Sequence, residues 1–262
     1  MKVTFLGAGL YGEALGKMAE SNDHEVKYYD PFKFPGVELA EAVSEAEAVV
    51  YVAPALAYPE ILPGLSRETP LILASKGFVS MAPFADFKNF SVLSGAAFAE
   101  DLVEGDHQVR LTASSELSEQ IFTTDFLTIE FCKDAKGIML CGALKNVYAI
   151  GAGILMDKEH PEQYFSEAFL EMQDVLKANG CEEDTATLSC GLPDLILSST
   201  PDGRNFRFGK EIRNHPSSKV EPAGTVEGLT VIESLENFSD FVIPEDAGLI
   251  KEIIEKVKNA TE

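Results

Sequence analysis

One lysine stands inside a long apolar segment and is the first candidate for chemistry. Lys145 is the only charged residue among the twenty between Lys136 and Asp157. A segment this long and apolar is either a membrane span or a buried core helix, and a mid-span lysine costs about 2.5–3.5 kcal/mol. Because no second span accompanies it, we expect a core helix. A buried ammonium needs a partner or a task, so Lys145 is the leading candidate for an acid/base group.

A glycine-rich turn near the start of the chain is typical of dinucleotide binding. It reads G-x-G-x-x-G, follows an expected strand at 2–6, and precedes a helical pattern that runs to residue 20. Such glycines let the backbone approach a pyrophosphate at the helix N-terminus, and an acidic residue about 20 positions on accepts hydrogen bonds from the ribose. The alternative is a glycine turn with no ligand. We expect the cofactor to contact Gly7, Gly9, Leu10, Tyr11, Gly12 and Asp30.

Two further sets of basic residues suggest binding of an anion. Lys76 follows the strand expected at 70–74, at the end where ligands of open α/β sheets bind, although a strand-end lysine can simply be solvated. The stretch 201–220 carries five basic residues against two acidic ones. This stretch includes three of the five arginines in the chain, and the arginine fork suits phosphate. The alternative is a helix whose arginines pair with nearby carboxylates.

The pattern of apolar runs predicts the elements that hold these residues. Short apolar strands alternate with helices as far as residue 131, which predicts a Rossmann-type, doubly wound, mostly parallel α/β sheet. From residue 134 the pattern is all-helical, with helices expected at 161–179, 206–214, 225–238 and 246–258. A stretch punctuated by Gly and Pro separates the first two of these helices. We therefore predict a dinucleotide-binding domain at 1–133 and a helical substrate domain at 134–262.

Composition excludes several classes of function. The net charge of −22 argues against nucleic acid and anionic membrane surfaces as partners. The N-terminus enters a strand without a signal-peptide pattern, and the four cysteines form no C-x-x-C pair, so we expect a cytoplasmic protein with reduced thiols. The four histidines are scattered singly, and we expect no metal site. No integral membrane segment is expected, and a homodimer is a candidate assembly.

Six motifs together resemble the NAD(P)-dependent glycerol-3-phosphate dehydrogenases, and they cover nearly the full length of the chain. The motifs are GAGLYGEAL at the start, ASKGF around Lys76, LSGAAFAED at 93–101, CGALKNVYAIGAGI around Lys145, GLPDLILSSTPDGRNFRFG at 191–209, and VEG at 226–228. The GALKN helix combined with the downstream D-L and G-R-N blocks is specific. The glycine loop by itself is not.

The resemblance implies a Rossmann domain followed by a helical substrate domain. It also implies hydride transfer between NAD(H) and C2 of dihydroxyacetone phosphate or sn-glycerol 3-phosphate. It assigns acid/base catalysis to Lys145 with Asp194 as its partner, and makes Lys76 a second active-site lysine near the substrate. It assigns phosphate binding to Arg204 and Asn205, a further substrate contact to Ser198 and a cofactor contact to Glu227. NAD is expected rather than NADP, because Asp30 would meet the 2′-phosphate of NADP.

Departures from the family pattern leave an alternative open. The connection at 31–46 is short, Gly95-Ala-Ala-Phe-Ala99 replaces the usual G-P-S-F-A, Pro193 replaces a glycine before D-L, and 159–164 lacks the usual arginine. The alternative is a Rossmann-fold reductase of the same architecture acting on another small keto or hydroxy compound. A third hypothesis is a cofactor-binding sensor that has lost turnover, against which the joint presence of Lys145, Asp194, Arg204 and Asn205 argues.

Overall fold

The computed structural model describes residues 1–216 and 218–261, and the chain divides into two compact units. The first unit comprises Met1–Lys76 and Met81–Ala135, and the second comprises Gly77–Ser80 and Lys136–Glu262. The short segment that follows Lys76 thus belongs to the helical unit, which the sequence pattern does not foreshadow. The assignment of 1–133 to dinucleotide binding and of 134–262 to substrate binding stays a prediction.

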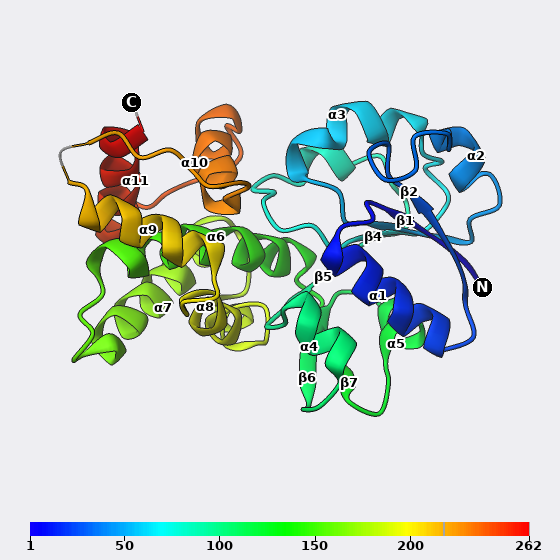
Figure 1. Ribbon diagram of the computed structural model, residues 1–262, viewed down its shortest axis with the longest axis horizontal. Coiled ribbons are helices and arrows are strands. Elements are labelled where there is room, and N and C mark those ends of the chain that lie inside the picture. Colours follow the sequence, from blue (N-terminus) through cyan, green and yellow to red (C-terminus); the bar gives the residue numbers. More distant parts are fainter. Residues whose placement is uncertain (217, 262) are drawn as a thin grey trace. The chain divides into compact units, whose positions relative to one another are not determined.

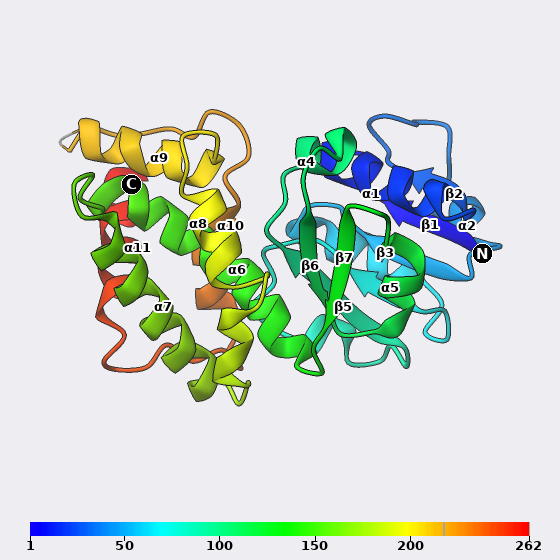
Figure 2. The same ribbon diagram turned by 90° about the horizontal axis from the view of Figure 1, so that it is seen from below.

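The first unit is built on a seven-stranded sheet of order β2-β1-β3-β4-β5-β6-β7 (Figures 1 and 2). Its strands are β1 (Lys2–Leu6), β2 (Glu25–Tyr29), β3 (Ala48–Tyr51), β4 (Leu71–Leu73), β5 (Phe90–Gly95), β6 (Val109–Ala113) and β7 (Leu127–Phe131). Its α-helices are α1 (Leu10–Ser21), α2 (Leu39–Val43), α3 (Tyr58–Ile61), α4 (Ala99–Glu104) and α5 (Glu116–Phe122). The predicted alternation of strands and helices is confirmed, including the strands expected at 2–6 and 70–74, whereas α4 was not predicted.

Strands β1 to β5 pair in parallel, β6 runs antiparallel to β5, and β7 runs parallel to β6. The mostly parallel, doubly wound fold class is therefore confirmed. Helices α1, α4 and α5 pack on one face of the sheet, where Leu15, Leu102 and Phe122 join the strand side chains in one buried cluster. Figure 1 shows α2 and α3 on the opposite side. Leu6 pairs with Tyr29 of β2 and Tyr51 of β3, so the carboxyl ends of three strands lie level.

The second unit is helical and surrounds one long apolar helix. Its α-helices are α6 (Ala135–Leu155), α7 (Pro161–Ala178), α8 (Leu192–Ser198), α9 (Arg204–Asn214), α10 (Glu227–Asn237) and α11 (Gly248–Thr261). Helix α6 is the one helix among the described residues with the length and apolarity of a membrane span, but 94% of an apolar 18-residue stretch within it is buried inside the protein. The prediction of a buried core helix is therefore confirmed.

Glycines along α6 and its neighbours let helix backbones meet closely. A Cβ added at Gly153 of α6 would lie 2.3 Å from the carbonyl oxygen of Phe206 in α9. A Cβ at Gly209 of α9 would lie 2.0 Å from the carbonyl oxygen of Ile150. These contacts explain why a buried helix carries residues that weaken an isolated helix by about 1 kcal/mol each. They also fix α9, which carries the basic cluster, against α6, which carries Lys145.

Helix α8 corrects the sequence analysis, which predicted only a stretch punctuated by Gly and Pro before the helix at 206–214. Pro193 lies in the first turn of α8, where a missing N–H leaves no intrahelical hydrogen bond unmade. Gly191 precedes it, and a Cβ there would lie 2.1 Å from the carbonyl oxygen of Ala186. Gly191 and Pro193 therefore define the start of a short helix.

A buried carboxylate ties the C-terminal helix to this bundle. Glu171 of α7 accepts hydrogen bonds from the backbone N–H groups of Leu249 (2.8 Å) and Ile250 (2.7 Å) in the first turn of α11. The hydroxyl of Tyr148 on α6 also donates to Glu171 at 3.1 Å. Three helices therefore meet at one side chain, which supplies the N-terminal cap that α11 needs.

Replacing Glu171 is expected to destabilise the protein. Glu171→Ala should lower the free energy of unfolding by about 2–4 kcal/mol, because it removes a helix cap and leaves buried donors without acceptors. Urea denaturation measures this change. Glu167→Ala is the matched control, since Glu167 is exposed one turn earlier on the same helix. Equal stability of the two variants would contradict the capping role.

The same carboxylate should give stability a pH dependence of defined sign. Burial raises the pKa of Glu171 above its ordinary value, outweighing the hydrogen bonds that it accepts from Ile250, Leu249 and Tyr148. Because the pKa is higher in the folded state, the stabilisation from Glu171 is fully present below the ordinary pKa of a glutamate. It is lost as the pH rises through the raised pKa of the folded state. The stability difference between wild type and Glu171→Gln should therefore shrink as pH rises through this range. Parallel curves for the two proteins would contradict this expectation.

Candidate active site

The second unit holds a buried cluster of one lysine, one serine and one aspartate. The ammonium of Lys145 donates to the hydroxyl of Ser198 at 2.6 Å and lies 3.2 Å from Oδ1 of Asp194. The Ser198 hydroxyl in turn donates to the same Asp194 oxygen at 3.3 Å. Side chains of Lys145 and Asp194 are only 7% and 2% exposed. The buried ammonium that the sequence predicts thus has a carboxylate partner in this structure.

Helical geometry explains why these groups meet. Asp194 and Ser198 are four residues apart on α8, so they share one face of that helix. This face meets α6 at Lys145, and the carboxylate lies in the first turn of α8, where negative charge is favoured. A buried ion pair is costly to form and is strongly destabilised when one partner is removed. The ion pair is therefore weak evidence for a purely stabilising role, and a catalytic role of the cluster stays a prediction.

A second buried network lies beside this cluster on α6, α9 and α10. Asn205 donates through Nδ2 to Oδ1 of Asn146 at 2.8 Å and accepts at Oδ1 from the backbone N–H of Gly228 at 2.9 Å. Asn146 itself donates to the carbonyl oxygen of Gly142 at 3.1 Å. The Asn205 side chain thus holds the start of α10 against α6. A direct contact of Asn205 with a substrate phosphate stays a prediction.

Arg204, at the start of α9, forms an ion pair with Glu227, the first residue of α10. The arginine side chain is 55% exposed and the glutamate side chain 28% exposed. Both residues adjoin the Asn205 network, because Asn205 follows Arg204 and Gly228 follows Glu227. The predicted phosphate-binding arginine and the predicted cofactor-contacting glutamate are therefore direct partners in this structure.

In the first unit, the glycine loop has the shape that a dinucleotide needs. Gly7 has φ +111°, and a Cβ there would lie 2.8 Å from the backbone nitrogen of Ala53. A Cβ at Gly12 would lie 2.5 Å from the Gly7 carbonyl oxygen, whereas one at Gly9 meets no atom within 4 Å. Helix α1 therefore starts beside open space, and its N-cap makes no side-chain hydrogen bond. The loop fits an approaching pyrophosphate on structural grounds.

Asp30 ends β2 and is tied to this loop. Its Oδ2 accepts from the backbone N–H of Ala8 at 2.9 Å, and its Oδ1 accepts from Phe32 at 3.0 Å and Lys33 at 3.1 Å. Partial burial pushes the pKa of Asp30 up, but these hydrogen bonds and the Lys33 ammonium hold it below its ordinary value. The carboxylate is therefore charged at neutral pH and fixed at the edge of the sheet where the ribose is expected.

Lys76 also lies beside the glycine loop of this unit. Its ammonium donates to the carbonyl oxygen of Gly95 at 2.9 Å and lies 5.9 Å from the ring centroid of Tyr11. The lysine is thus held at the carboxyl edge of the sheet rather than extended into solvent. The predicted site residues form two groups, with Gly7–Gly12, Asp30 and Lys76 in the first unit and Lys145, Asp194, Ser198, Arg204, Asn205 and Glu227 in the second.

Two residues that were not predicted contact members of these groups. Asn146 follows Lys145 and anchors Asn205, and its position directly after the lysine was the available signal. Phe32 lies two residues after Asp30 and is 96% exposed, which is unusual for so large an apolar side chain. Its backbone N–H donates to Asp30, at the strand end where the ribose is expected. An aromatic residue just past that strand could have been flagged from the sequence.

The helical half of the chain matches a family model, and larger parts of the chain are similar to named relatives. Residues 134–259 match the model for the NAD-dependent glycerol-3-phosphate dehydrogenase C-terminus. A glycerol-3-phosphate dehydrogenase [NAD(P)+] of Deinococcus radiodurans is 31% identical over 209 residues, which are 73% of this chain and 63% of the relative. A glycerol-3-phosphate dehydrogenase [NAD(P)+] 1 of Lactobacillus delbrueckii subsp. bulgaricus is 25% identical over 317 residues, covering 98% of this chain and 94% of that one.

A solved structure shows the same fold. Glycerol-3-phosphate dehydrogenase from Coxiella burnetii superposes with a TM-score of 0.80 at 18% identity, covering 98% of this chain and 94% of that one. The match of the helical half to the family model agrees with the motifs around Lys145, Asp194 and Arg204. Residues 134–259 therefore place the helical half of this chain in the NAD-dependent glycerol-3-phosphate dehydrogenase family, and the whole chain is similar to NAD(P)-dependent members of that family.

Proposed function

We propose that this protein is an NAD-dependent glycerol-3-phosphate dehydrogenase, which reduces dihydroxyacetone phosphate at C2 and oxidises sn-glycerol 3-phosphate in the reverse direction. The observation that carries the proposal is the buried Lys145–Ser198–Asp194 cluster. Nothing in the fold requires an ion pair in the middle of an apolar helix, whereas a ketone reductase needs a positioned proton donor. NAD(H), held by the glycine loop, would supply or accept the hydride.

Lys145 is the residue that handles the proton in this proposal. When the C2 carbonyl is reduced, the oxygen that develops negative charge takes a proton from the Lys145 ammonium. Asp194 and the Ser198 hydroxyl fix the direction of the ammonium, because both lie within 3.2 Å of its nitrogen. Ser198 thereby acts through Lys145 in addition to the substrate contact that the family resemblance implies. Lys76 is the second active-site lysine of the proposal.

Arg204 supplies the grip on the substrate phosphate. Its guanidinium pairs with Glu227, so a bound phosphate would share the arginine with this carboxylate or displace it. Asn205 positions Arg204 by holding the starts of α9 and α10 together with α6. Energy from the phosphate contact, which is remote from C2, then orients the ketone for hydride transfer.

Oxidation of NADH by the purified protein tests the proposal directly. Dihydroxyacetone phosphate should be reduced at least about a hundredfold more efficiently than unphosphorylated dihydroxyacetone, because the phosphate contact is lost with the latter. The substrate panel should include other small ketones and 2-keto acids. Comparable activity on an unphosphorylated compound would instead support a reductase of the same fold with a different substrate.

The proposal also gives a cofactor preference. We expect kcat/KM with NADH to exceed that with NADPH by roughly ten- to a hundredfold, since the 2′-phosphate would lie beside the Asp30 carboxylate. Lys33 does little to reverse this, because its ammonium lies 2.5 Å from Glu13. Lys27 does little to reverse the preference either, because its ammonium pairs with Glu45 at 3.4 Å.

Steady-state kinetics with both cofactors measures the preference. Asp30→Asn should narrow the ratio, and Asp23→Asn, an exposed acid before β2, should leave it unchanged. A wild type that uses both cofactors equally would remove Asp30 from this role.

A cytoplasmic location, a small phosphorylated substrate and a homodimeric assembly complete the proposal. Size-exclusion chromatography with light scattering tests the last of these.

A further inference from the structure

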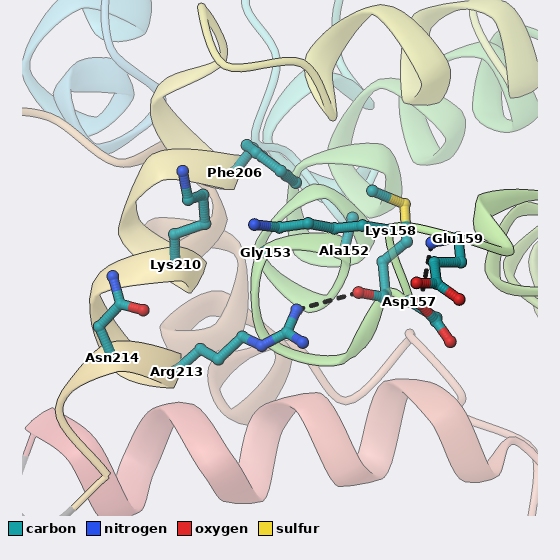
Figure 3. Close-up of a pocket in the computed structure, with 10 residues that line it drawn as sticks. Ala152, Gly153, Asp157, Lys158, Glu159, Phe206, Lys210, Arg213 and Asn214 are labelled. Carbon is teal, nitrogen blue, oxygen red and sulfur yellow. Dashed lines mark hydrogen bonds between the residues drawn. The ribbon is translucent and has the colours of Figure 1, made fainter.

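A second group of basic side chains lines a pocket at the C-terminal end of α6, away from Lys145 in the middle of that helix. The pocket has a volume of about 290 Å³ and lies where the end of α6 and the chain after it face α9 (Figure 3). Its lining includes Lys158, Lys210, Arg213 and Asn214, and none of the proposed catalytic or phosphate-binding residues. Gly153, in the pocket wall, is eight residues after Lys145, which is roughly 12 Å along the helix.

The basic and acidic side chains of this pocket lie on different sides of it. Figure 3 shows the Lys158 side chain reaching across the pocket toward Lys210 on α9, with the carboxylates of Asp157 and Glu159 on the other side. Asp157 accepts a hydrogen bond from the backbone N–H of Glu159 at 2.9 Å. Within the described part of the chain, Lys158 and Lys210 make no ion pair or hydrogen bond with another side chain. The lining therefore holds three basic side chains against two acidic ones, a local excess of positive charge in a protein of net charge −22.

Helix electrostatics explain only one of the three cations. Arg213 donates through Nη1 to the carbonyl oxygen of Met156 at 3.0 Å, so it satisfies a carbonyl just past the end of α6. This bond also holds the guanidinium in place at the pocket, with donors left over. Lys158 and Lys210 have no such carbonyl partner among the described residues. They therefore hold two ammonium groups and part of a guanidinium around a space large enough for a small ligand.

We propose that this pocket binds a small phosphate-bearing anion, separately from the substrate site at Arg204. A phosphate group carries close to two negative charges and accepts several hydrogen bonds, which matches two lysines and a pre-positioned arginine. The volume admits inorganic phosphate or a small phosphate ester. Because α6 and α9 pack backbone to backbone through Gly153 and Gly209, a ligand here contacts the same two helices that carry Lys145 and Arg204.

Calorimetric titration of the full-length protein with inorganic phosphate tests the inference, at constant ionic strength set with chloride. Wild type should bind phosphate, and Lys158→Gln/Lys210→Gln should bind it at least roughly tenfold more weakly in this pocket. Arg213 is left intact because it satisfies the end of α6. The control Lys88→Gln/Lys177→Gln removes the same charge at exposed sites and should bind as wild type does. A parallel titration with glycerol 2-phosphate distinguishes free phosphate from a phosphate ester as the preferred ligand.

Arg204→Ala separates this pocket from the substrate site. It should retain the phosphate binding that Lys158→Gln/Lys210→Gln loses. If only Arg204→Ala abolishes binding, the sole phosphate site is the proposed substrate site and the inference is wrong. Loss of binding in the Lys88→Gln/Lys177→Gln control would show that phosphate binding depends only on net charge, and would overturn the inference. Absence of phosphate binding by the wild type would overturn it as well. These outcomes leave the proposed dehydrogenase activity untouched, since activity is measured separately with dihydroxyacetone phosphate.

Discussion

Lys145→Met should lower kcat for reduction of dihydroxyacetone phosphate by several orders of magnitude. Positioned proton transfer contributes about 10²–10⁴-fold, and the variant also leaves Asp194 buried without its cation. Methionine preserves the length and apolar stem of lysine, so the helix should still pack. The affinity for NADH, measured by quenching of nucleotide fluorescence, should stay close to the wild-type value, because the glycine loop belongs to the other unit.

The control for this variant is Lys136→Met on the same helix. Lys136 donates to the carbonyl oxygen of Asn179 at 2.8 Å and belongs to no part of the proposed site, so its loss should affect stability more than turnover. The pair therefore separates catalysis from helix packing. If Lys145→Met turns over within tenfold of wild type, the proton donor lies elsewhere and Lys76 becomes the next residue to test.

Arg204→Ala should lower kcat/KM for dihydroxyacetone phosphate by about a hundredfold, because a charge-assisted phosphate contact contributes about 1.5–3 kcal/mol. The measured loss of kcat/KM also includes the effect of leaving Glu227 without the arginine that pairs with it in this structure. Activity on unphosphorylated dihydroxyacetone should change little, since that compound never makes the contact. Arg204→Lys should recover only part of the loss, because an ammonium cannot form the two-pronged contact of a guanidinium.

Arg207→Ala is the matched control for Arg204. Arg207 lies three residues later on α9, and its guanidinium donates to the carbonyl oxygens of Pro201 and Asp202 at 3.3 and 3.0 Å. Its loss removes the same charge from the same basic cluster without removing the proposed phosphate contact. Equal losses of kcat/KM in both variants would show that the cluster acts through general charge, and would remove the specific role from Arg204.

The order of local elements was predictable because it depends on short-range pattern. The strands of the first unit, the glycine loop and the apolar α6 all follow from periodicity and from glycine placement along the chain. The Lys145 prediction rested on the same kind of reasoning, since a charge within an apolar helix must be paired whatever surrounds it. The carboxylate partner was assigned to Asp194 by resemblance, and the structure places that carboxylate 3.2 Å from the ammonium.

Tertiary structure decided what depends on packing between distant segments. Helix α8 was not foreseen, because seven residues containing a proline form a helix only where neighbouring helices hold them. The role of Asn205 as a brace between Asn146 and Gly228 could not be inferred, since its partners are 59 and 23 residues away. The pairing of Arg204 with Glu227 and the basic pocket at Lys158 and Lys210 likewise arise where separate helices converge. A single sequence fixes which residue types are present, but distances between side chains on different helices depend on how the helices pack.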